Sequence, residues 1–201
     1  QYNSSLKALL EPCSRNTAPA IAFLCMYLSH HGKKDEVVGI FPADHYIDDE
    51  KSFHRALEVA SRAAEEKDCI VTLGVKPDHA ATGYGYIELD TQVEYKAHEV
   101  LNFREKPSAK IAAEYLKKGT YFWNAGIFLF QPMTMKAAFN VHAPDILQSV
   151  IGAVSASSDI ENIIALDPDK FAECRKDSVD YAIMEKAQNL SVMPFQGEWS
   201  D

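Results

Sequence analysis

The feature that most constrains the fold of this chain is an alternation of short apolar runs and helical stripes along its first third. Residues 36–41 and 69–75 form short apolar, β-branched runs, which are typical of buried strands. Between them, apolar residues recur at helical spacing over about residues 50–66. This alternation favours a mostly parallel sheet covered by helices on both faces, which predicts the α/β class.

The rest of the chain carries further signals for regular structure. Asn16 and Thr17 precede an expected helix that runs to Gly32, with Pro19 in its first turn. Residues 86–89 and 100–105 are expected to form a ribbon of two strands. The remaining expected elements are a helix over 108–118 that stops at Gly119, strands over 121–130 and 190–195, and a mostly helical stretch over 132–186.

Composition limits the classes to which the chain can belong. Its 201 residues are 47% hydrophobic and 24% charged, which suits a globular protein, and one domain is the simplest count. The net charge of -9 argues against a general nucleic-acid surface. No apolar run reaches about 18 residues, so no transmembrane helix is expected. The cysteines form no Cys-x-x-Cys pair, so we expect reduced thiols, a cytoplasmic protein and no zinc site.

Two acidic residues are candidates for a metal site. Asp44 follows an apolar run in Phe41-Pro-Ala-Asp-His45, and Asp201 stands at the end of Gly197-Glu-Trp-Ser-Asp201. A carboxylate at the carboxyl end of a strand is well placed to hold a hard cation over a phosphate. The simpler interpretation of Asp44 is a turn cap, and His45 is interpreted as a loop histidine that forms a hydrogen bond.

A charged pair at the end of the expected ribbon is a candidate for binding a sugar phosphate. Glu105 can accept two sugar hydroxyls while Lys106 meets a phosphate, although a solvated charge cluster also fits. Successive strand residues point to opposite faces. The two side chains can therefore share a ligand only where Pro107 breaks the pleat.

Two further positions also fit either a ligand-binding role or a purely structural one. Asn124 interrupts the apolar run over 121–130, so its amide must bond either a ligand or neighbouring backbone. Gly85, in Thr82-Gly-Tyr-Gly-Tyr86, either lets the backbone touch a ligand or forms a plain hairpin turn.

A polar loop over residues 11–19 precedes the first expected helix. A helix N-terminus attracts anions and offers free N–H groups. Arg15 is a candidate to meet phosphate charge there, while Asn16 and Thr17 also fit simple helix caps.

Each motif is ambiguous by itself, but their order along the chain is specific. The chain contains in series Glu-Pro-x-x-Arg-Asn-Thr-Ala-Pro-Ala, Pro-Ala-Asp-His, Thr-Gly-Tyr-Gly-Tyr-Ile, Glu-Lys-Pro, Trp-Asn-x-Gly-x-Phe, Asp-Tyr-Ala-x-Met-Glu-Lys and Trp-Ser-Asp. Over residues 11–201 it resembles the bacterial mannose-1-phosphate guanylyltransferase family, the GDP-mannose pyrophosphorylases.

The resemblance implies a fold and a set of site residues. The fold would be a nucleotidyltransferase domain over residues 1–201 with a Rossmann-like mixed sheet, lacking the family's N-terminal phosphate loop and its C-terminal part. Asp44 and Asp201 would hold Mg²⁺ and, with Lys106, form the catalytic set. The other implied contacts are Gly85, Glu105 and Asn124 with the sugar, Lys106 with the sugar phosphate, and Arg15, Asn16, Thr17 and Asp44 with the nucleotide.

The reaction implied by the resemblance is GTP plus mannose 1-phosphate to GDP-mannose plus pyrophosphate, in polysaccharide biosynthesis. No general base is expected, because the attacking phosphate, with a second pKa near 6, is already charged at neutral pH. Little activity is expected from these residues without the phosphate loop. No nucleic-acid or membrane partner is expected, and a homo-oligomer stays open. The alternatives are an enzyme of similar fold for another nucleotide or sugar, and a non-catalytic sugar-nucleotide-binding subunit.

Overall fold

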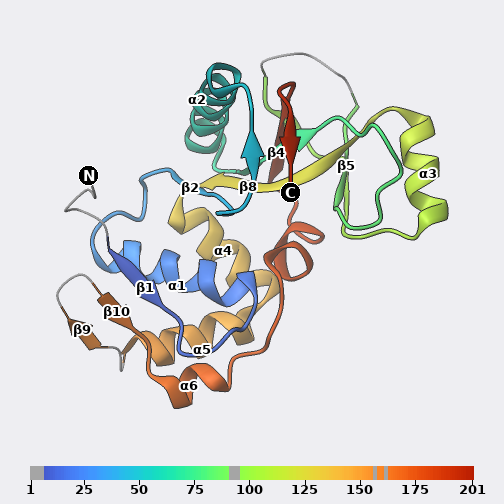
Figure 1. Ribbon diagram of the computed structural model, residues 1–201. Coiled ribbons are helices and arrows are strands. Elements are labelled where there is room, and N and C mark those ends of the chain that lie inside the picture. Colours follow the sequence, from blue (N-terminus) through green and yellow to red (C-terminus); the bar gives the residue numbers. More distant parts are fainter. Residues whose placement is uncertain (1–6, 91–95, 156–157, 161–162) are drawn as a thin grey trace. The chain divides into compact units, whose positions relative to one another are not determined.

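The structure is a computed structural model that describes residues 7–90, 96–155, 158–160 and 163–201. It divides into two compact units, each of which is described by itself (Figure 1). The sheet unit comprises the described parts of Asp35–Thr134 and Ala187–Asp201, and the helical unit those of Gln1–Lys34 and Met135–Lys186. Within these described ranges, no helix is both long and apolar enough to cross a membrane.

A mixed sheet forms the centre of the sheet unit. Its strands follow the order β6 (His98–Glu99), β11 (Leu190–Phe195), β4 (Ile70–Val75), β8 (Tyr121–Phe130), β5 (Tyr86–Glu88) and β7 (Asn102–Arg104), and β2 (Val38–Ile40) also pairs with β8. β4 and β11 are parallel, whereas β8 runs antiparallel to β2, β4 and β5. Hence β2, β4, β5 and β11 share one direction, and the expected α/β class with a mixed sheet is confirmed.

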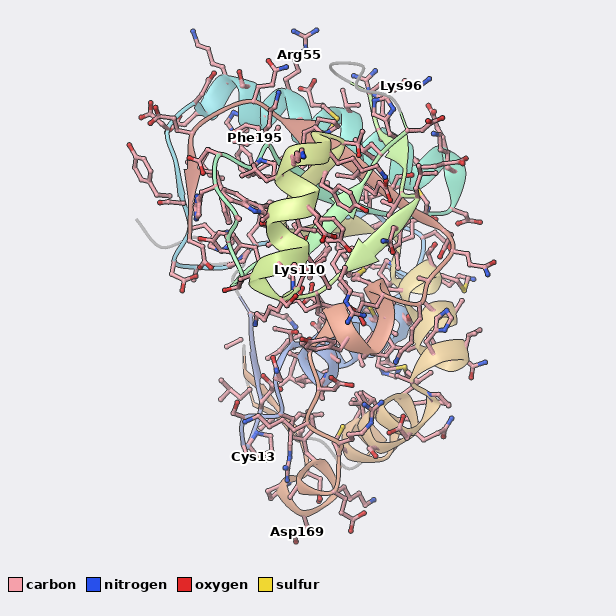
Figure 2. The ribbon with its side chains drawn as sticks, turned by 90° about the vertical axis from the view of Figure 1, so that its right-hand side faces the viewer. Cys13, Arg55, Lys96, Lys110, Asp169 and Phe195 are labelled. Carbon is pink, nitrogen blue, oxygen red and sulfur yellow. The ribbon has the colours of Figure 1, made fainter. Side chains whose placement is uncertain are left out.

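Two helices pack on the sheet. α2 (Glu50–Lys67) buries alanines at helical spacing, including Ala56, Ala60 and Ala64, against β4, β8 and β11. These small side chains let the helix axis lie close to the strands. α3 (Ala109–Lys118) packs on β8; Ser108 caps its start, and it ends at Gly119 as expected. Figure 2 shows the exposed outer faces of these helices, marked by Arg55 on α2 and Lys110 on α3.

Helices make up most of the helical unit. α1 (Thr17–His30) packs on α5 (Pro144–Ser155), which also contacts α6 (Pro168–Ala172). Asn16 caps α1 as expected, because its Oδ1 accepts a hydrogen bond from the N–H of Thr17 (2.8 Å). α4 (Pro132–His142) begins in the sheet unit and continues into this one. A single-turn π-helix, η1 (Asp180–Met184), lies where an ordinary helix was expected.

A small sheet in the helical unit was not predicted. β1 (Ala8–Leu10) is parallel to β10 (Ile163–Ala165), which is antiparallel to β9 (Ser158–Ile160). The sequence predicted a mostly helical stretch there, with a loop over 155–158 of which residues 156–157 lie outside the described residues. Local periodicity misses these strands because each is three residues long and the partner of β1 is distant in sequence. All four cysteines are free thiols, as expected.

Candidate active site

A short two-stranded ribbon carries the candidate metal site. β3 (Tyr46–Ile47) is antiparallel to β12 (Trp199–Ser200), with Ile47 opposite Trp199 and Tyr46 opposite Ser200. The backbone N–H of Asp48 continues the pairing by donating to the carbonyl of Glu198 (3.3 Å). Residues 198–200 are thereby held beside the loop that follows β2.

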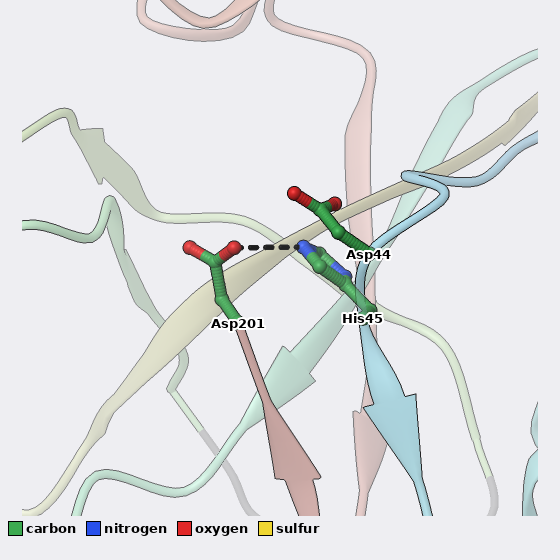
Figure 3. A group of neighbouring side chains, drawn as sticks. All are labelled: Asp44, His45 and Asp201. Carbon is green, nitrogen blue, oxygen red and sulfur yellow. Dashed lines mark ion pairs between the residues drawn. The ribbon is translucent and has the colours of Figure 1, made fainter.

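Asp44, His45 and Asp201 meet at one end of this ribbon (Figure 3). One potential ligand atom from each, a carboxylate oxygen or an imidazole nitrogen, lies within 4.8 Å of the other two. Asp44 and Asp201 are exposed, whereas the side chain of His45 is only 9% exposed. Two carboxylates that are far apart in the sequence therefore lie together in space.

This group has the composition that a hard divalent cation prefers. Mg²⁺ takes oxygen ligands at about 2.0–2.1 Å, commonly one or two carboxylates completed by water and substrate phosphates. Two oxygens on one such ion lie at most about 4.2 Å apart. Asp44 and Asp201 are exposed, so changes of side-chain rotamer can bring carboxylate oxygens that lie within 4.8 Å of each other onto one ion. Among the described residues, no second group of three such side chains comes equally close.

Gly85, Glu105 and Asn124, the three residues that the resemblance assigns to a sugar, also lie together. The N–H of Asn124 donates to the carbonyl of Gly85 (2.8 Å). A Cβ built on Gly85 would lie 2.6 Å from Oε2 of Glu105 and 3.3 Å from Cβ of Asn124. Glu105 and Asn124 are each 8% exposed. The missing side chain at Gly85 is therefore what lets a buried carboxylate approach the backbone.

The amide of Asn124 is oriented by its own sheet. Its Oδ1 accepts hydrogen bonds from the hydroxyl of Thr72 (2.8 Å) and the N–H of Gly126 (3.2 Å). Gly126 has a φ of +67° and lies where the register of β4 and β8 shifts. A Cβ on Gly126 would lie 3.7 Å from Cγ of Pro42 and 3.9 Å from Cε1 of His45. The bulge that holds Asn124 therefore adjoins the loop of the metal group.

Glu105 and Lys106 lie side by side just after β7. Nζ of Lys106 is 3.7 Å from Oε1 of Glu105. Lys106 has a φ of +43°, a left-handed conformation that costs a non-glycine residue about 1–2 kcal/mol. Such strain persists where the surrounding structure imposes it, and it clusters at functional sites. The pleat is broken here, and the binding of one ligand by both side chains stays a prediction.

Arg15, Asn16 and Thr17 lie at the start of α1 in the helical unit. The guanidinium of Arg15 donates to the carbonyl of Ala172. The hydroxyl oxygen of Thr17 accepts a hydrogen bond from the N–H of Val179 (2.9 Å), and Asn16 has a φ of +69°. These contacts fasten the loop to a later segment of the same unit, and its role toward a nucleotide stays a prediction.

His45 and Trp199 belong to the site in a way that the sequence did not specify. Nε1 of Trp199 donates to Nδ1 of His45 (3.2 Å), and the two rings meet edge to face at 5.3 Å. Nε2 of His45 lies 3.4 Å from Oδ1 of Asp201. The prediction of a hydrogen-bonded His45 is confirmed. The signal for Trp199 was its spacing of two residues from Asp201, which puts both side chains on one face of a strand.

Comparison with known proteins identifies the family. The sequence model of the family described as Nucleotidyl transferase matches residues 1–201. The chain belongs to this nucleotidyl transferase family. Its members generally use a divalent metal ion, and the neighbouring carboxylates of Asp44 and Asp201 fit one.

Individual relatives of this nucleotidyl transferase cover most of its chain. It is 41% identical over 197 residues to alginate biosynthesis protein AlgA of Pseudomonas fluorescens, which covers 97% of this chain and 40% of that protein. It is 39% identical over 200 residues to mannose-1-phosphate guanylyltransferase of Escherichia coli, which covers 98% of this chain and 42% of that protein. The chain thus spans about two fifths of the length of these curated relatives.

A solved structure supports the fold of this nucleotidyl transferase. The crystal structure of mannose-6-phosphate isomerase from Helicobacter pylori matches with a TM-score of 0.87 at 30% sequence identity. The match covers 96% of this chain and 74% of that one.

Proposed function

We propose that this protein transfers GMP from GTP to mannose 1-phosphate, releasing pyrophosphate, with Mg²⁺ held by Asp44 and Asp201. The observation that carries the proposal is the meeting of these two carboxylates at the β3–β12 ribbon. The name of the Escherichia coli relative supports the choice of substrates. The product GDP-mannose would serve polysaccharide biosynthesis in the cytoplasm, where four free cysteines are expected to stay reduced.

The proposed reaction needs little acid–base catalysis by the protein. A phosphate oxygen of mannose 1-phosphate attacks the α-phosphorus of GTP in line, and the bond to the β-phosphate oxygen breaks. The nucleophile is already charged at neutral pH, because its second pKa is near 6. The main barrier is the approach of two anions. When bound, a divalent cation would neutralise part of the phosphate charge at this site.

The side chains of the sheet unit have distinct roles in this proposal. Asp44 and Asp201 hold the cation, and Lys106 offers a positive charge to the sugar phosphate beside Glu105. Glu105 accepts hydrogen bonds from sugar hydroxyls next to Gly85. Oδ1 of Asn124 already accepts from Thr72 and Gly126, so the amide would meet a hydroxyl with Nδ2 as donor. Fixed groups of this kind lower the barrier by positioning and charge stabilisation.

The nucleotide side of the proposal involves the start of α1. Arg15, Asn16 and Thr17 would contact the guanine. The tethered loop supports this role because a fixed backbone presents its polar groups in one geometry.

The test is a pyrophosphate-release assay on the complete gene product with GTP, ATP, UTP and dTTP, each paired with mannose 1-phosphate and glucose 1-phosphate. We expect metal-dependent release with GTP and mannose 1-phosphate. Asp44→Asn and Asp201→Asn should each lower kcat/KM by about 1000-fold, equivalent to losing about 4 kcal/mol of charge stabilisation. Asp48→Asn, an exposed acid beside the same ribbon, is the matched control and should stay within about twofold.

Other outcomes would separate the rivals. Pyrophosphate release with another nucleotide or sugar 1-phosphate would change the proposed substrates but keep the proposed type of reaction. Binding of GDP-mannose without pyrophosphate release would favour a non-catalytic binding subunit. The Helicobacter pylori relative is named for an isomerase, so conversion of mannose 6-phosphate should be measured in parallel. Normal turnover in Asp44→Asn would refute the metal site.

A further inference from the structure

The register of the β3–β12 ribbon places three side chains on one face. Tyr46 lies opposite Ser200, so the next antiparallel pair along the ribbon would be His45 and Asp201. Residues two apart on a strand share a face, and directly opposite side chains are close neighbours. Trp199 and Asp201 therefore flank His45, one diagonally and one across the ribbon. The contacts that His45 makes agree with this register.

The hydrogen bond from Trp199 selects one tautomer of His45. An indole N–H can only donate, so the bonded Nδ1 must be the acceptor nitrogen of the imidazole (3.2 Å). A neutral imidazole carries its single proton on the other nitrogen. Nε2 is then an N–H donor, and it faces Oδ1 of Asp201 at 3.4 Å. Trp199 thus donates to His45, and the N–H of His45 in turn points to Asp201.

This series of side-chain contacts argues against His45 as a third metal ligand. A histidine ligand needs a lone pair on the nitrogen that faces the ion. If Nε2 coordinated a metal while Nδ1 accepted from Trp199, neither nitrogen would carry a proton and the ring would be an imidazolate anion. His45 is also nearly buried, with 9% of its side chain exposed, whereas Asp201 is 48% exposed. The imidazole is therefore the fixed partner and the carboxylate is the group that it orients.

We propose that His45, with its tautomer selected by Trp199, is a positioning residue that orients the carboxylate of Asp201 for the divalent cation. The inference rests on the proposed metal site. An exposed aspartate has several rotamers, and ordering one of them on binding costs side-chain entropy. A donor that selects one rotamer in advance lowers that cost. Removing a side chain that orients a metal ligand typically weakens metal affinity by about 10-fold to 100-fold.

The first test reads the tautomer directly in the unaltered protein. A long-range proton–nitrogen spectrum of the histidine rings should show the proton of His45 on Nε2. Trp199→Phe keeps an aromatic ring against His45 and Tyr84 but removes the N–H donor, so it should raise the fraction protonated on Nδ1. A proton found on Nδ1 of His45 in the unaltered protein would overturn the proposal.

The second test measures metal binding without turnover, by titrating the protein with Mn²⁺ and Ni²⁺. His45→Ala should lower the affinity for both ions by about 10-fold, and Trp199→Phe should lower it by less. His45→Gln should keep part of the affinity that His45→Ala loses, because the glutamine amide can donate a hydrogen bond. Tyr46→Phe, which removes an exposed hydroxyl from the same ribbon, should bind like the parent. Unfolding midpoints identify any variant that fails to fold.

Other results would show that His45 is itself a metal ligand, or that it has no role at the metal site. Imidazole suits Ni²⁺ better than Mn²⁺, whereas carboxylates suit Mn²⁺. A much larger loss of Ni²⁺ than of Mn²⁺ affinity in His45→Ala would make His45 a ligand and overturn the positioning role. If Asp44→Asn and Asp201→Asn lose Mn²⁺ while His45→Ala and Trp199→Phe keep it, the positioning role alone fails. If the two aspartate variants keep Mn²⁺, the metal site fails and the inference falls with it.

Discussion

Gly85→Ala is a sharp perturbation of the proposed sugar site, because one added carbon would meet a buried carboxylate. The new Cβ would lie 2.6 Å from Oε2 of Glu105, whereas ordinary contact begins at 3.4 Å, so the carboxylate must move by about 0.8 Å. Asn124 and Phe103, each 3.3 Å from the same Cβ, restrict the other ways of making room. A displacement of this size in a positioning group lowers a rate by about 100-fold.

The assay is steady-state pyrophosphate release by the complete gene product, with the concentration of the sugar phosphate varied. We expect kcat/KM for mannose 1-phosphate to fall by about 100-fold, while KM for GTP changes little. Overpacking should also cost about 1–3 kcal/mol of folding free energy, or about 2–4 °C in the unfolding midpoint for each kcal/mol.

Gly83→Ala is the matched control, because it makes the same change two residues earlier and its Cβ would meet nothing within 4 Å. Unchanged kinetics in Gly85→Ala, or an equal loss in Gly83→Ala, would refute the proposed link between Gly85 and Glu105.

Two further predictions concern stability. Thr72→Val removes the hydroxyl that bonds Oδ1 of Asn124, so denaturant unfolding should show a free energy of unfolding lowered by about 1–3 kcal/mol, and KM for the sugar phosphate should rise. Thr134→Val, a control at another buried threonine, should leave this KM unchanged. An equal rise of KM in both variants would contradict the reasoning. Arg175 donates to Asp145 (2.6 Å), and this hydrogen bond lowers the pKa of the Asp145 carboxyl below its usual 3.8. The folded pKa is the lower one, so the stabilisation is present above pH 3.8 and is lost as the pH falls through the folded pKa. Asp145→Asn should therefore cost at most about 1 kcal/mol at pH 7, and a difference that persists unchanged in acid would contradict this.

Local signals predicted the parts of the fold that are stabilised locally. The apolar run at β4 and the apolar stripe of α2 were recognisable because strand and helix bury side chains with different periods. The cap Asn16 and the stop at Gly119 were recognisable because each acts on backbone groups at the end of its own helix. These signals do not depend on what the element packs against.

The candidate site depended on contacts that no local pattern contains. The sequence marked Asp44 and Asp201 as acids near strand ends, but only the pairing of β3 with β12 puts them together and sets His45 between Trp199 and Asp201. The strand pairing of β1 with β10 is of the same kind.

The sequence alone determined the longer strands and helices, since propensity, capping and period act within a few residues, but it did not determine the three-residue strands β1, β9 and β10. The tertiary structure decided register, and register decides which side chains face each other. A shift of one residue in a strand turns every side chain to the opposite face. The meeting of two distant carboxylates therefore follows from long-range strand pairing, which a single sequence does not encode as a local signal.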